Sequence, residues 1–117
     1  MPSFDLGDVV RVPFPYTDRP IRQRRRALVV STGGLGENGR LAWVAMITSA
    51  ENRAWPDDVP FGERYADAGL PAPSIIRPCK LTTIESRHAE KIGRVDADLM
   101  KAVIAFLRRS LDPRHPA

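Results

Sequence analysis

The sequence predicts a mainly β domain, a small barrel of short strands closed by one helix at the C-terminal end. Two observations support this fold class. Short runs rich in Val, Ile and Leu alternate with turns rich in Gly and Pro as far as Val95, and the hydrophobic period then changes to that of a helix. The 117 residues contain no repeat or linker, so we expect a single domain spanning residues 1–117.

The expected strands are short apolar runs bounded by turn signals. They lie at residues 9–14, 27–31, 41–48, 58–61, 74–77 and 91–95. The runs 27–31 and 41–48 are apolar at successive positions, which is typical of buried strands. Pro13 limits pairing in the first run, so that strand should stop there or lie near an edge. Five or six short strands avoid exposed edges by closing into a barrel.

The terminal helix is predicted by apolar residues that recur on one face of a 3.6-residue period. These residues are Leu99, Val103, Phe106, Leu107 and Leu111. Asp96 is a favoured N-cap residue, and Arg108 and Arg109 suit the last turn, where positive charge interacts favourably with the helix dipole.

The segment 34–39 matches the pattern G-x-G-x-x-G, which in dinucleotide-binding proteins leads into a helix. Here Arg40 leads into another β-type run, and Asn38-Gly39 is a dipeptide favoured in hairpins. We therefore expect a turn between two strands at this point, and no dinucleotide site.

Most of the positive charge is carried by arginine. The chain has 18 Lys and Arg against 14 Asp and Glu, a net charge of +4, and only Lys80, Lys91 and Lys101 are lysines. Guanidinium groups bind phosphate oxygens bidentately, so an arginine-rich domain suggests a polyanionic partner. A genome rich in G and C would produce the same bias, so the positions of the arginines carry more information than their number.

Several classes of protein are not expected from this sequence. The single cysteine, Cys79, excludes an internal disulfide and an all-cysteine metal site, and the two histidines have no nearby carboxylate partners with ligand spacing. We therefore expect no protein-bound metal and no cofactor, and composition alone leaves open a magnesium ion held mostly by substrate phosphates. The longest apolar run, 41–47, is far shorter than the roughly 20 residues of a membrane span, and the N-terminal residues do not resemble a secretory signal. A cytoplasmic protein is expected.

Five arginines lie within eight residues that contain no acid: Arg19, Arg22, Arg24, Arg25 and Arg26. We call the segment 19–26 the arginine lip. Such dense like charge is either a solvated loop or a surface that binds phosphates. Arg25 and Arg26 adjoin a strand and are therefore better preorganised than Arg19 or Arg22.

Other polar and aromatic residues have two interpretations each. Thr48 and Ser49 end a buried strand, where hydroxyls either cap a turn or bind a phosphate. Arg77 ends another strand and either forms a salt bridge or contacts a nucleic acid. Tyr16 and Trp55 lie in loops and could stack on bases, although partial core burial is equally compatible with Trp55.

Six segments of the chain carry a family pattern. They are Gly7-Asp8-Val9-Val10, Arg25-Arg26-Ala27-Leu28-Val29-Val30-Ser31, Ile47-Thr48-Ser49, Pro73-Ser74-Ile75-Ile76-Arg77-Pro78, Lys80-Leu81-Thr82-Thr83-Ile84 and Ile92-Gly93-Arg94-Val95. Together with the terminal helix they resemble the MazF/PemK family of toxin ribonucleases. The resemblance extends over nearly the whole chain in order, which makes it more specific than any single motif.

The resemblance implies an SH3-like barrel that forms a homodimer and binds single-stranded RNA in a groove lined by both subunits. It implies cleavage without a metal, in which the ribose 2′-hydroxyl attacks the adjacent phosphorus and leaves a cyclic phosphate and a 5′-hydroxyl. It also implies a cognate antitoxin as a protein partner. By position, Arg25 corresponds to the family's catalytic arginine and Thr48 to its catalytic threonine, while Arg77 matches an arginine implicated in some members. The remaining predicted RNA-binding residues are Arg19, Arg22, Arg24, Arg26 and Ser49.

Two residues depart from the family pattern. Arg26 stands where the family usually has a proline, and Cys79 stands where an acid is common, so that a base role for this acid would have to pass to Glu85 or be lost. Two alternatives follow: a noncatalytic RNA- or protein-binding barrel, and a gyrase poison of the CcdB type. The second is less consistent with the sequence, because CcdB-type chains carry a Trp-Gly-Ile-type terminus and this chain ends in Pro116-Ala117.

Elementary chemistry assigns roles to the two central residues. Attack on a phosphodiester places negative charge on the nonbridging oxygens, which a fixed guanidinium such as that of Arg25 stabilises. Arginine keeps its proton, so Arg25 is better suited to stabilise the transition state than to act as an acid. Thr48 would orient the phosphate through its hydroxyl, and DNA would be excluded because it lacks the attacking 2′-hydroxyl.

Overall fold

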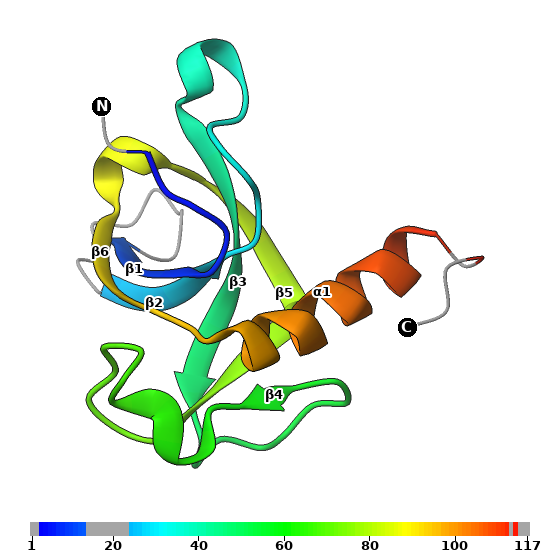
Figure 1. Cartoon of the computed structure of the whole chain (residues 1–117). Helices are drawn as coiled ribbons and strands as arrows, with labels where there is room; N and C mark the ends of the chain where they lie inside the picture. Colours follow the sequence, from blue (N-terminus) through cyan, green and yellow to red (C-terminus); the bar gives the residue numbers. More distant parts are fainter. Residues whose placement is uncertain (1–2, 14–23, 113, 115–117) are drawn as a thin grey trace.

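The computed structural model describes residues 3–13, 24–112 and 114. Six strands form one antiparallel sheet that curls into a half-barrel, with one helix against it (Figure 1). The strands are β1 (Asp8–Pro13), β2 (Arg24–Val29), β3 (Leu41–Ser49), β4 (Val59–Pro60), β5 (Ser74–Glu85) and β6 (Glu90–Arg94), and the helix is α1 (Ala97–Leu111). The prediction of a mainly β fold with a C-terminal helix is confirmed.

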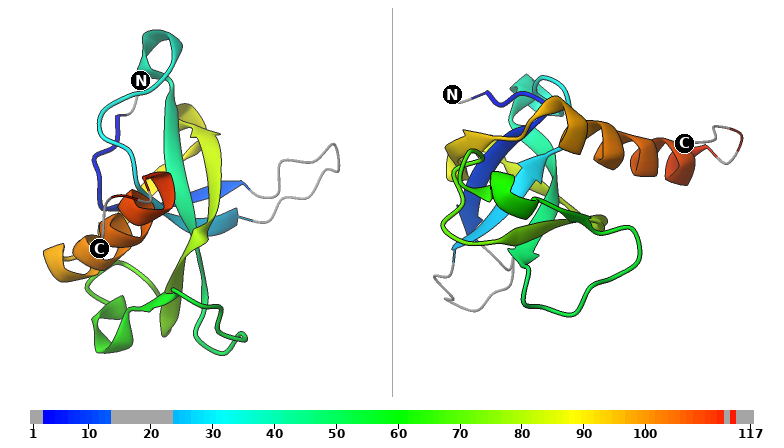
Figure 2. Two further views of the ribbon diagram at one scale, coloured as in Figure 1. Left: turned by 90° about the vertical axis from the view of Figure 1, so that its right-hand side faces the viewer. Right: turned by 60° about the horizontal axis from the view of Figure 1, so that its bottom comes forward.

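The order of strands across the sheet is β4-β5-β3-β2-β1-β6. The two long strands β3 and β5 cross the molecule, and α1 lies on one side of the curled sheet (Figure 2). The segment 34–39 forms a turn that contains the short 3-10 helix Glu37–Gly39 and leads into β3, as expected. No helix in the described part of the chain has the length and apolar character needed to cross a membrane.

β5 is longer than the sequence predicts, because Pro78 does not end it. The β3–β5 register jumps from Ala45 opposite Leu81 to Met46 opposite Arg77, so residues 78–80 form a bulge. Proline is tolerated in a bulge because it needs no ladder hydrogen bond there. β5 therefore continues through the proline and carries the family-like segment 80–84 along the sheet.

The hydrophobic core fills both faces of the central strands. One cluster packs under α1 and the segment 61–70 and contains Val9, Leu28, Ala45, Ile47, Phe61, Ala68, Leu70, Ile76, Val95, Leu99, Met100 and Val103. The other contains Phe4, Val10, Val12, Ala27, Val29, Ala42, Val44, Met46 and Ile84. Because successive residues of β2 and β3 alternate between the two clusters, both strands are buried on both sides, as their continuous apolar runs predicted.

The helix begins where predicted: the Asp96 side chain accepts a hydrogen bond of 2.9 Å from the Leu99 backbone N–H. Its first half buries Leu99, Met100 and Val103 against the sheet. Its second half is less covered, and Leu111 is 83% exposed. The apolar face of α1 therefore extends beyond the surface that the sheet covers.

The segment between β4 and β5 is held against β6 by a close backbone approach. A Cβ atom at Gly93 would collide with the Ala68 carbonyl, and Gly69 has a positive φ of 83° that favours glycine. This contact fixes the chain just before residues 71–74, which form one wall of the site described below.

Candidate functional site

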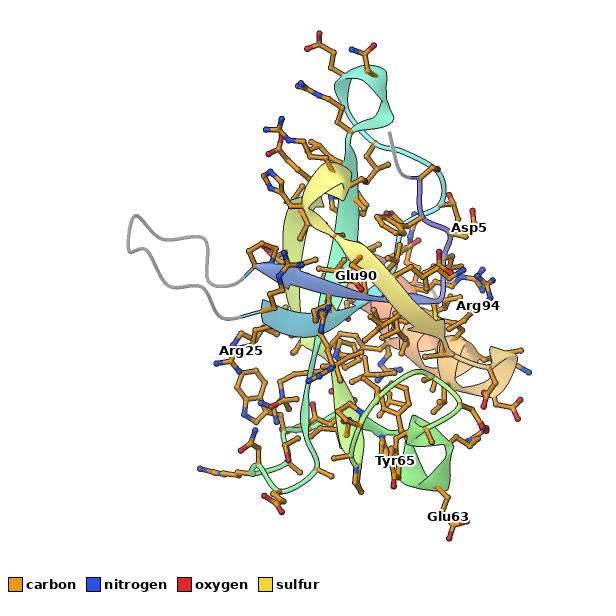
Figure 3. All side chains as sticks on the ribbon, turned by 90° about the vertical axis from the view of Figure 1, so that its left-hand side faces the viewer. Asp5, Arg25, Glu63, Tyr65, Glu90 and Arg94 are labelled. Carbon is orange, nitrogen blue, oxygen red and sulfur yellow. The ribbon has the colours of Figure 1, made fainter. Side chains whose placement is uncertain are left out.

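A hollow of about 230 Å³ lies where β2 begins, β3 ends and β5 begins. Its lining residues are Arg25, Arg26, Ile47, Thr48, Ser49, Asn52, Pro71, Ala72, Pro73 and Ser74. Four residues predicted for RNA, namely Arg25, Arg26, Thr48 and Ser49, are thus brought together on one surface. Figure 3 shows Arg25 pointing outward from the beginning of β2.

The register of β2 and β3 explains why Arg25 and Thr48 meet. Ala27 pairs with Met46 in an antiparallel ladder, and extending this register by two residues places Arg25 opposite Thr48. Residues opposite each other in an antiparallel pair project from the same face. The β2–β3 pairing ends at Ala27 and Met46, and the hollow that Arg25 and Thr48 help to line lies beyond this end.

Thr48 is oriented by the turn that follows β3. Its Oγ1 accepts a hydrogen bond of 2.6 Å from Nδ2 of Asn52, and the Asn52 backbone N–H donates to the Ser49 carbonyl at 3.1 Å. Because the Thr48 oxygen accepts one bond, its own hydrogen can be donated to a phosphate oxygen. Asn52 is not predicted by the sequence, in which its only signal is its position four residues after Thr48 in a turn.

The electrostatic character of the hollow favours an anion. The described residues of its lining include two arginines, three hydroxyl side chains and one amide, and no carboxylate or histidine is among them. Arg26 lies opposite Arg11 of β1, and among the described residues the buried Nε atoms of both arginines have no hydrogen-bond partner.

Arg77 does not line the hollow. Its Nε and Nη2 donate to the two carboxylate oxygens of Asp58 at 3.2 and 3.0 Å, and Nη2 also donates to the Arg53 carbonyl at 2.8 Å. The guanidinium stacks on the Trp55 indole, 4.0 Å from the ring centre. Arg77 therefore holds the loop between β3 and β4, and contact with RNA stays a prediction for this residue.

The Arg77–Asp58 pair is nearly buried, with side chains 10% and 6% exposed. Burial alone would raise the pKa of the Asp58 carboxyl. The hydrogen bond from Arg77, the bond from the Trp55 backbone N–H and the charge of Arg77 outweigh it and hold the pKa below its ordinary value.

We expect Asp58→Asn to lower the free energy of unfolding at pH 7 by about 3 kcal/mol, because it leaves the buried guanidinium of Arg77 without a counter-charge. The carboxylate stabilises the fold fully above its ordinary pKa of 3.8, and this contribution is lost as the pH falls through the lower native pKa. Urea unfolding at a series of pH values should therefore show the difference from wild type shrinking below about pH 4.

Asp57→Asn is the matched control, because Asp57 forms an exposed ion pair with Arg109 and should contribute less than about 1 kcal/mol. Equal stability of wild type and Asp58→Asn at pH 7 would contradict the proposed contribution of the Arg77–Asp58 pair to the stability of the fold.

The other predicted residues lie around the hollow or outside the described part of the chain. Arg24 is exposed at the start of β2, opposite Pro13. Arg19, Arg22 and Tyr16 lie outside the described residues.

Neither candidate for the family's acid reaches this site. Cys79 lines a different, apolar groove described below. Glu85 pairs with Leu41 at the far end of β3, seven residues or about 23 Å along the strand from Thr48. Its carboxylate interacts with Arg87 and His88 instead. The interpretation in which Glu85 of the same chain replaces the acid at the hollow is therefore wrong. Among the described residues, no group of three or more His, Cys, Asp or Glu side chains is arranged to hold a metal ion.

Comparison with known proteins adds a family to this geometry. A family model described as PemK-like, MazF-like toxin of type II toxin-antitoxin system matches residues 5–111. A comparison with curated protein sequences found no match.

Solved structures share the fold at low sequence identity. A chain of a MazE–MazF crystal structure from Deinococcus radiodurans is similar with a TM-score of 0.71 and 22% identity, over 96% of this chain and 98% of that chain. An endoribonuclease from a mycobacterial species is similar with a TM-score of 0.69 and 18% identity, over 95% and 93% of the two chains. A structure of an endoribonuclease with its cognate antitoxin, also mycobacterial, gives a TM-score of 0.66 and 18% identity, over 92% and 93%.

Proposed function

The chain belongs to the PemK-like, MazF-like family of toxins of type II toxin-antitoxin systems, and we propose that it is an endoribonuclease that cleaves single-stranded messenger RNA without a metal. The observation that carries the proposal is that Arg25 and Thr48 line one hollow, at the positions that the β2–β3 register brings opposite each other when it is extended by two residues. We further propose that this cleavage inhibits growth and that the protein acts in the cytoplasm.

In the proposed reaction the scissile phosphate occupies the hollow. The ribose 2′-oxygen bonds to phosphorus and loses its proton to solvent water, while the bond to the 5′-oxygen breaks and that oxygen takes a proton from solvent water. A 2′,3′-cyclic phosphate and a 5′-hydroxyl result. Arg25 stabilises the charge that develops on the nonbridging oxygens, and Thr48 donates a hydrogen bond that orients the phosphate. We propose that the described lining residues contribute electrostatic stabilisation of the transition state.

The neighbouring polar residues extend the phosphate-binding surface. Arg26 and Ser49 line the hollow beside the catalytic pair, and Arg24 precedes them on β2. We propose that these residues, with Arg19 and Arg22 of the arginine lip, contact the phosphates on either side of the cut. Arg77 supports RNA binding through the loop that it holds.

We expect purified protein in EDTA to cut a long RNA and to leave 2′,3′-cyclic phosphate and 5′-hydroxyl ends. Arg25→Ala should lower the rate at least about 100-fold, the usual effect of removing one donor to a developing oxyanion. The cleavage rate of Arg25→Lys should lie between those of wild type and Arg25→Ala, because lysine keeps the positive charge and lacks the forked donors of the guanidinium. The measurement is single-turnover cleavage with mapping of the cut ends.

Arg87→Ala is the matched control, since Arg87 is an exposed arginine at the far end of the sheet and the change removes the same charge. Wild-type rates in Arg25→Ala would refute the assignment of Arg25. RNA that is bound but never cut by wild type would favour the noncatalytic barrel instead.

A second surface fits the homodimer that we propose. An apolar groove of about 910 Å³ lies between the outer half of α1 and the strands β3 and β5. Trp43, Leu81 and Leu111 line it and are 53%, 50% and 83% exposed. Contiguous apolar surface of this kind on a small domain is typical of a protein–protein interface. We propose that a second copy of the chain covers this groove.

We expect Leu81→Glu to convert a dimer into a monomer, because it places a charge within the apolar groove. Sedimentation at micromolar concentration should show half the mass, with an unchanged circular dichroism spectrum. Ala102→Glu is the control, because Ala102 is exposed on α1 and does not line the groove. A monomeric wild-type protein, or a dimeric Leu81→Glu variant, would contradict the proposed interface.

We also propose a cognate antitoxin as the protein partner. Two of the similar structures are toxin–antitoxin complexes. An acidic and apolar antitoxin segment would complement the arginine lip, and it would keep RNA from the same surface.

A further inference from the structure

We propose that the outward face of Trp55 is a stacking platform for a nucleobase of the RNA, next to the phosphate site formed by Arg25 and Thr48. The inference rests on the proposed function for the identity of the ligand. The hollow by itself would contact only the RNA backbone, and contacts to phosphates fix the position of the RNA without reading its sequence. A stacking platform would add contact with a base, which can give a preference for particular bases.

The indole is half-exposed and yet firmly held. Trp55 is 43% exposed, although one of its faces is covered by the Arg77 guanidinium at 4.0 Å. Its backbone N–H donates to Oδ2 of Asp58 at 2.8 Å, and its carbonyl accepts from the Asp58 N–H at 3.2 Å. The ring is thus supported from behind and anchored at its backbone, so stacking on the open face costs little conformational entropy.

Strand register places this ring on the same face as the phosphate site. Arg77 pairs with Met46, and Met46 precedes Thr48 by two residues on β3. The side chains of Arg77 and Met46 therefore project from the face of the sheet that carries Thr48. Along β3 the offset between Met46 and Thr48 is about 7 Å, and Arg77 lies one strand farther across the sheet, on β5. An RNA strand that runs from the hollow across β5 therefore passes the indole on this face of the sheet.

The surroundings of Trp55 favour a base over an apolar protein surface. Trp43, the other tryptophan, lies in the apolar groove among Leu81 and Leu111. Trp55 is absent from that groove and is stacked on a cation within a loop of exposed polar residues. An aromatic ring beside a cationic phosphate site is the usual arrangement for single-stranded nucleic acid.

The test uses intrinsic fluorescence in a Trp43→Phe background, in which Trp55 is the only tryptophan. The probe is a mixed-sequence 2′-O-methyl oligoribonucleotide in EDTA, which keeps the bases and cannot be cut because its 2′-oxygen is blocked. We expect the RNA to quench Trp55 and an abasic oligonucleotide of the same length and charge not to do so.

Affinities of matched variants complete the test, measured with a labelled probe. In the same background, Trp55→Leu should weaken binding about tenfold or more, while Trp55→Phe should retain most of the affinity because phenylalanine keeps a stacking face. Circular dichroism and urea unfolding of each variant show whether the fold and the stability provided by the Arg77–Asp58 pair are retained.

The outcomes separate this inference from the proposed function. A wild-type protein that cuts RNA while Trp55 shows no quenching, or while Trp55→Leu binds as tightly as its parent, overturns the platform and leaves the nuclease. Quenching without any cleavage of ordinary RNA supports the platform and overturns the nuclease. Equal quenching by the abasic strand also overturns the platform. Quenching by polyglutamate, a mimic of an acidic protein segment, without quenching by RNA would overturn it as well.

Discussion

The pairing register between β2 and β3 is the constraint on which the site depends. Ala27 and Val29 of β2 share one core cluster with Met46 and Val44 of β3, while Leu28 and Ala45 belong to the other. A slip of one residue would turn each buried side chain to the wrong face, so the core specifies the register strongly. The same register places Arg25 opposite Thr48, which means that hydrophobic burial in the sheet sets the geometry of a polar site at its edge.

The loop between β3 and β4 supplies what the strands do not. Its first turn brings the Asn52 amide into a hydrogen bond with the Thr48 hydroxyl, and its last residues are held by the bonds from Arg77 to Asp58.

The two residues that depart from the family pattern lie in different parts of the structure. Arg26, in place of a proline, adds a second cation to the hollow, and Cys79 lies in the apolar groove, away from the hollow.

Much of this was accessible from the sequence, because strands buried on both faces and an amphipathic helix leave clear periodic patterns. The residues that required the structure are those whose partners are distant in sequence. Arg77 was expected at a strand end, but its partner Asp58 lies 19 residues earlier, and nothing local predicts their pairing. The length of β5 was underestimated because Pro78 normally ends a strand, and only pairing with β3 shows that it falls in a bulge. The apolar residues of α1 predicted burial along the whole helix, but Leu111 at its end is 83% exposed.

The central claim is that Arg25 and Thr48 act on a single phosphate, and a double-mutant cycle tests it most directly. Single-turnover cleavage rates would be compared for wild type, Arg25→Ala, Thr48→Val and the double variant. If both side chains act on one phosphate, the double variant should be scarcely slower than the slower single variant, because the effects of groups that act as a unit do not add. If the two losses in rate simply multiply, the side chains act independently, and the shared hollow is not where the cut is made.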